Sequence, residues 1–268
     1  MAAAVPRLAC ALVVSLVVSL AAVGCAEDTV RLSFRPPPGQ QAAYRITVRA
    51  VTVTDIEGQE PRRTVSDTVL HARHRVLESG PDGGRVEVRL RAADGPATTF
   101  VVEVDRAAQL TEVQTVETLP AGALGDLGLS EIFPAAAAAP PDRPLAPGAQ
   151  WSIDEPVRVG AAPSRLAGEG RLVRLQVADG RSLAHVASDY RLPVQRTAEE
   201  TGGRVELTGS QATTATVAYD VDDGAVHSAR ARTSGRYQVR LLPPPGVTGA
   251  PVPGSLVVDV DSRTRRVD

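Results

Sequence analysis

The side chains that could do chemistry are few, and the four histidines are the first to consider. His71 and His74 have the spacing of metal ligands on a helix, but in a strand residues three apart point to opposite faces. Alternation places His71 beside Arg73 and Arg75, and His74 on the other face. The remaining two are His185, on a face with Asp189 and Arg191, and His227. We interpret all four as sheet residues rather than as bases or metal ligands.

The aspartates offer two further candidates for chemistry. Asp220-Val-Asp222-Asp223-Gly224 resembles the start of a calcium loop, but it lacks the regular alternation and the closing glutamate. We interpret it as an acidic hairpin turn. Asp259 and Asp261 could form a carboxylate pair on one strand face, although 31 acidic residues make such pairs common by chance.

Motifs of catalysis and of cofactor binding are missing from the sequence. It contains no Gly-x-Ser-x-Gly nucleophile elbow and no glycine-rich loop of the P-loop or dinucleotide type. We therefore expect a protein that is not an enzyme and that uses no cofactor and no metal.

The N-terminal segment has the order of an export signal. Arg7 precedes an apolar run over 11–23, and small residues follow at Gly24 and Cys25. The run is too short for a membrane span, which needs about 20 apolar residues. We expect a signal peptide over 1–24.

The end of this segment indicates what happens to Cys25. Ala22-Val23-Gly24-Cys25 resembles the lipobox of bacterial lipoproteins, although leucine is commonest where this chain has Ala22. The resemblance implies cleavage before Cys25 and a diacylglycerol on its sulfur. It also implies a tether over 25–30 and a location on the extracytoplasmic face of the cell membrane. An ordinary signal peptide, cleaved elsewhere, is the alternative.

Composition narrows the classes of partner. All 29 basic residues are arginine, which we interpret as the codon bias of a GC-rich genome, and the net charge is −2. A nucleic-acid surface would need a clustered basic excess, so no nucleic-acid partner is expected. Eight aromatic residues are too few for a platform that stacks bases or sugars.

Alternation of apolar and polar residues dominates the chain after the signal. Val86, Val88 and Leu90 alternate with charged residues, and similar runs recur between turn sequences such as Gly80–Gly84 and Asp179-Gly180. One solvent-exposed face and one buried face are typical of antiparallel sheets. The sequence predicts an all-β domain of about ten or eleven strands over 31–268, with a curved or half-open sheet.

One segment departs from this alternation. Residues 119–133 carry Leu124, Leu127 and Ile132 at roughly helical spacing, which predicts one short helix, and a proline- and alanine-rich connector follows to residue 148. On either side, 31–118 and 149–268 open alike, with Pro38-Gly39 before Tyr44 and Pro147-Gly148 before Trp151. A duplicated β-meander, or the independent recurrence of common hairpin sequences, would explain this equally well.

These openings, the central segment and the late hairpin Tyr219–Val226 together resemble a group of actinobacterial lipoproteins. More distantly, the chain is similar to the lipoprotein-carrier half-barrels. That resemblance implies a curved antiparallel sheet around an apolar cavity, although this chain has less helix than those carriers.

Two functions follow as expectations. The first is an envelope lipoprotein that holds an apolar, lipid-like ligand on a concave sheet. The segment 119–133 would then act as a lid, and its side chains toward the ligand would be Leu124, Leu127, Ile132 and Phe133. The alternative is a non-catalytic structural or protein-interaction lipoprotein whose sheet packs a closed core.

The lipid anchor can be tested at one residue. Cys25→Ser should abolish incorporation of labelled fatty acid, because the acylated sulfur is gone, and should leave an unprocessed or differently cleaved chain. Detergent-phase partitioning of both proteins measures this. Equal label in the wild type and the variant would contradict the anchor.

Overall fold

The computed structural model describes residues 29–92, 95–106, 110–116, 140–159, 162–200, 203–243 and 246–267. Every regular element in these ranges is a strand, so the all-β prediction is confirmed. The eleven strands are β1 (Gln41–Ile56), β2 (Arg62–Gly80), β3 (Gly83–Ala92), β4 (Ala97–Asp105), β5 (Leu110–Val116), β6 (Gln150–Val159), β7 (Ala162–Ala178), β8 (Arg181–Glu200), β9 (Gly203–Asp220), β10 (Val226–Leu242) and β11 (Val252–Arg266).

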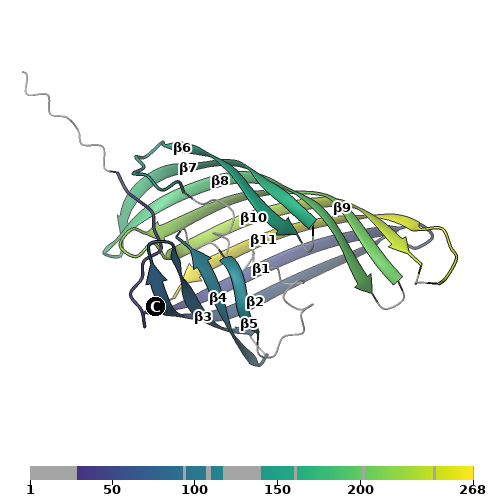
Figure 1. Ribbon diagram of the computed structural model, residues 1–268, viewed down its shortest axis with the longest axis horizontal. Helices are drawn as coiled ribbons and strands as arrows, with labels where there is room; N and C mark the ends of the chain where they lie inside the picture. The colour runs from purple at the N-terminus through teal and green to yellow at the C-terminus, as the bar shows by residue number, and fades with distance from the viewer. Residues whose placement is uncertain are drawn as a thin grey trace, which may run out of the picture.

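All eleven strands belong to one antiparallel sheet. Its order is β5-β4-β3-β2-β1-β11-β10-β9-β8-β7-β6, so two meanders meet where β1 pairs with β11. Within each meander, every strand pairs with its neighbour in sequence. The sheet curves strongly and stays open, with β5 and β6 as its edges (Figure 1).

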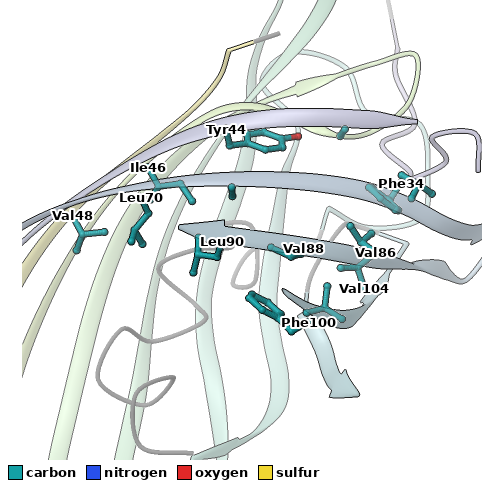
Figure 2. Close-up of a cluster of buried hydrophobic side chains, with 14 of the residues drawn as sticks. Phe34, Tyr44, Ile46, Val48, Leu70, Val86, Val88, Leu90, Phe100 and Val104 are labelled. Atoms are coloured by element: carbon teal, nitrogen blue, oxygen red, sulfur yellow. The ribbon is translucent and has the colours of Figure 1, made fainter. Parts of the chain in front are cut away.

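The alternation seen in the sequence separates an inner face from an outer face. On β3, Val86, Val88 and Leu90 are buried, whereas Arg89 is exposed and Arg85 and Glu87 are partly exposed. The same parity continues across the register, because Phe100 lies opposite Val88 and Val102 lies opposite Val86. We call the face with these buried residues the inner face; it is the concave one (Figures 1 and 2).

Predicted turns lie between the strands. β7 and β8 are joined by Asp179-Gly180, and both residues have positive φ, 53° and 73°, as a type I′ hairpin turn requires. Pro81 and Asp82 form the turn between β2 and β3. The hairpin connections are therefore encoded locally.

Aromatic rings lie against two glycines of the strands. A Cβ on Gly170 would collide with the ring of Trp151, its partner on β6, and one on Gly235 would collide with the ring of Tyr237. Glycine in a strand permits a sharp bend, and a neighbouring aromatic ring restores the lost packing. These pairs help to explain how so wide a sheet can be strongly curved.

The two meanders open with the same hydrogen bonds. Gly39 N donates to Val76 O (2.8 Å) and Gly148 N donates to Leu172 O (2.7 Å). Both glycines have positive φ, 85° and 88°. Val76 and Leu172 each lie next to a register shift in the following hairpin. This local equivalence is what a duplicated meander would leave.

The register on β3 gives a stability test. Val88→Asp should cost roughly 3–5 kcal/mol of unfolding free energy, because it places a charge at a fully buried position. Glu87→Ala, one residue away on the outer face, should cost under about 0.5 kcal/mol. Urea denaturation of both variants measures the difference, and similar losses would contradict the register.

Candidate ligand-binding face

The inner face of β1–β4 carries one continuous apolar cluster. Its side chains point into the space inside the curved sheet, as Figure 2 shows for Ile46, Leu70, Leu90 and Phe100. Phe34, from the segment before β1, and Ala225, from the β9–β10 turn, complete the cluster. The apolar faces of consecutive strands thus merge into one surface.

A second apolar cluster covers the other half of the same face. Leu172, Val186, Val217 and Tyr219 come from β7, β8 and β9. Two extended segments lie on this cluster: Val30 and Leu32 before β1, and Leu145 before β6. Val30 N and Leu145 N each donate to the other residue's carbonyl, at 2.9 and 2.8 Å. Val30, at the end of the expected tether, already packs into the domain.

These two segments close one end of the inner face with the help of the β9–β10 turn. Phe34 N donates to Arg106 O (2.6 Å) and Arg35 N donates to Asp223 O (2.8 Å). Gly224 has φ +70°, and a Cβ there would overlap the Ser33 carbonyl. We call this the closed end; it is where β1 begins and β9 ends.

Polar groups hold the β9–β10 turn in place. Asp223 accepts hydrogen bonds from Gln40 Nε2 (2.7 Å) and Ala225 N (2.8 Å), and Arg266 Nη1 lies 3.8 Å from its carboxylate. Asp220 accepts from Arg181 Nη1 (2.7 Å). The interpretation of this sequence as an acidic hairpin turn is confirmed: its carboxylates bind protein donors that hold the closed end together.

Small and hydroxyl side chains cross the middle of the inner face. Ser188, Ala215, Ala231 and Ser262 lie in one cross-strand row from β8 to β11, and all four are buried. In the next row, the hydroxyls of Thr213 and Thr233 are 2.8 Å apart. The side chains in the middle of the face are therefore shorter and more polar than those at the closed end.

At the far end, several apolar side chains of the inner face are only partly buried, whereas Val239 and Ile56 there are buried. β8 ends here, β9 begins, and β10 leads into β11. Leu207 lies opposite Val239, and Val205 lies opposite Leu241. The partly exposed apolar residues of the inner face here are Leu192, Val194, Val205, Leu207, Leu241, Leu256 and Val258. We call this the open end.

The candidate chemical residues are not gathered into a reactive site. His71 is exposed on the outer face, while His74 lies across the sheet with its Nε2 buried. Asp261 pairs with Arg230, Arg232 and Arg263 at 3.0–3.3 Å. Within the described ranges, no three His, Cys, Asp or Glu side chains could share a metal ion.

The residues predicted as sites lie outside the described residues. Cys25 precedes residue 29, and the lid positions fall within 117–139: Leu124, Leu127, Ile132 and Phe133. The open-end residues were not singled out from the sequence. Each belongs to an ordinary alternating strand, and only the pairing of β8–β11 brings them together.

Comparison with protein-family models and with curated proteins found no match to this chain. Among the residues that the structure describes, no helix is long and apolar enough to cross a membrane.

His74 should make stability depend on pH. Burial lowers its pKa to about 4, and its ring lies 4.6 Å from that of Tyr44. The unfolded chain takes up this proton near its ordinary value of 6.5. The contribution of His74 to the free energy of unfolding is therefore fully present above pH 6.5. It is lost as the pH falls toward 4, and the total loss is on the order of 3 kcal/mol.

Denaturant unfolding at a series of pH values, for wild type and His74→Phe, isolates this contribution. The variant should show a shallower loss of stability between pH 6.5 and 4, because it has no proton to take up. Parallel curves for the two proteins would contradict the assignment.

Proposed function

We propose that this protein is a lipoprotein of the cell envelope, anchored through Cys25, that binds an apolar, lipid-like ligand on the inner face of its sheet without catalysis. The observation that carries the proposal is the gradient of burial along that face. Most apolar side chains of the inner face are buried at the closed end, whereas several at the open end stay partly exposed. A soluble domain gains by covering such side chains, and a lipid chain is a suitable cover.

The shape of the sheet suits an elongated ligand. An open sheet of eleven strands presents a curved face, with β8 running 20 residues along it. At about 3.3 Å per residue, that strand is roughly 66 Å long, which exceeds the length of a lipid chain. An acyl chain could lie along the face between the open end and the row of small residues.

The short distance between Cys25 and Val30 would orient the protein on the membrane. Five residues span at most about 17 Å, and Val30 is buried at the closed end. A lipid on Cys25 would therefore hold the closed end next to the bilayer and direct the open end away from it. In this arrangement a ligand would be exchanged with a partner rather than directly with the anchoring membrane.

Photolabelling at the open end tests ligand binding. Membranes that contain the anchored protein are treated with a photoactivatable fatty acid, and the labelled peptides are mapped by mass spectrometry. Label should fall on inner-face residues, and Leu207→Arg should reduce it about tenfold, because a buried charge opposes apolar contact.

Thr208→Arg is the matched control, because Thr208 is exposed on the outer face one residue away. It adds the same charge and should leave the labelling unchanged. No label on the wild-type inner face would contradict the carrier function and favour the closed-core structural alternative.

A further inference from the structure

The outer face carries a compact group of basic side chains on β11, β1, β2 and β3. In one cross-strand row, Arg265 lies opposite Arg45, Arg45 opposite His71, and His71 opposite Arg91. In the next row, Arg73 lies opposite Arg89. These six residues, here called the basic patch, are brought together from four strands and are all exposed.

By itself, the basic patch lowers the stability of the folded sheet. Like charges directly opposite each other on paired strands destabilise an antiparallel sheet. Some arginines elsewhere on the outer face have acidic partners, such as Asp261 for Arg232 and Glu206 for Arg240. Within the described part of the chain, no patch residue forms an ion pair. Concentrated, unneutralised positive charge of this kind is suited to an anionic ligand.

A pocket lies within the basic patch. Its volume is about 320 Å³, and it is lined by Arg73, Arg89, Arg91 and His71 together with Ala43 and Ala97. Three guanidinium groups can each present paired N–H donors to the oxygens of an anion. The volume lies at the lower end of the range for small-molecule sites.

We propose that this pocket binds a phosphate group, either on a soluble molecule or on the headgroup of an anionic lipid. A phosphate group offers enough oxygens to bind several arginines, whereas a single carboxylate pairs with one guanidinium group. Glu87, opposite Arg75, and Asp261, beside Arg263, bound the patch on two sides. The positive surface is therefore local, which fits one phosphate group better than a long nucleic-acid backbone.

Titration calorimetry on the full chain in non-ionic detergent tests this with two soluble probes. Inorganic pyrophosphate stands for a free phosphate compound, and glycerophosphoglycerol stands for the headgroup of phosphatidylglycerol. Wild type should bind at least one of them saturably, more weakly at higher ionic strength. Arg73→Gln/Arg89→Gln should weaken binding about tenfold or more. The probe that binds better identifies the source of the phosphate.

Arg171→Gln/Arg191→Gln is the matched control, because both arginines are exposed on β7 and β8 and the change in net charge is the same. It should bind as wild type does. The patch variant should keep its melting temperature, because it removes a like-charge pair. Absence of saturable binding to both probes by wild type, or equal weakening in the two double variants, would overturn the proposal.

Discussion

Pairing of the first strand with the last holds the two halves of this sheet together. β1 runs antiparallel to β11 from Tyr44 opposite Arg266 to Ile56 opposite Gly254. All other pairings join strands that follow one another in the chain. The β1–β11 pairing must close a loop of about 200 residues, so it has a large entropic cost and should form late in folding. Polar contacts at the closed end support it, since Asp223 of the β9–β10 turn accepts from Gln40, just before β1, and also faces Arg266 at the end of β11.

The inner face follows from this pairing. Once β1 and β11 are joined, the apolar cluster of β1–β4 and that of β7–β10 belong to one surface, and Val260 of β11 packs with the first. The segments at Val30–Phe34 and Leu145 can then cover both clusters at one end. At the other end, Leu207 and Leu241 are only partly covered. This partial exposure is the physical reason for placing a ligand there.

The strands and turns could be predicted because their signals are local. Val86, Val88 and Leu90 alternate with charged neighbours, and Asp179-Gly180 has the residue types of a hairpin turn. The number of strands and the open antiparallel sheet followed from such patterns. The role of the Asp220–Gly224 turn did not, because its partners Gln40 and Arg266 are distant in sequence.

The basic patch, too, could not be predicted from local sequence patterns. Its members lie between residues 45 and 265, and in the sequence each is one arginine or histidine in an alternating strand. From the composition, the arginines are interpreted as codon bias and not as a binding signal. Only the register of four strands puts Arg73 opposite Arg89 and Arg45 opposite Arg265. Strand pairing, not local pattern, thus decides where this chain concentrates charge.

The two faces therefore have separate chemistry, with an apolar ligand proposed for one and a phosphate group for the other. Organic extraction of the purified full-length protein, followed by mass spectrometry, is the sharpest test of lipid binding on the inner face. The proposed anchor on Cys25 would be covalent and would stay with the protein, so an extracted lipid would come from a non-covalent site. We predict about one extractable lipid per protein. An extract without lipid, from protein that is folded and purified in a detergent that preserves bound lipid, would contradict the account.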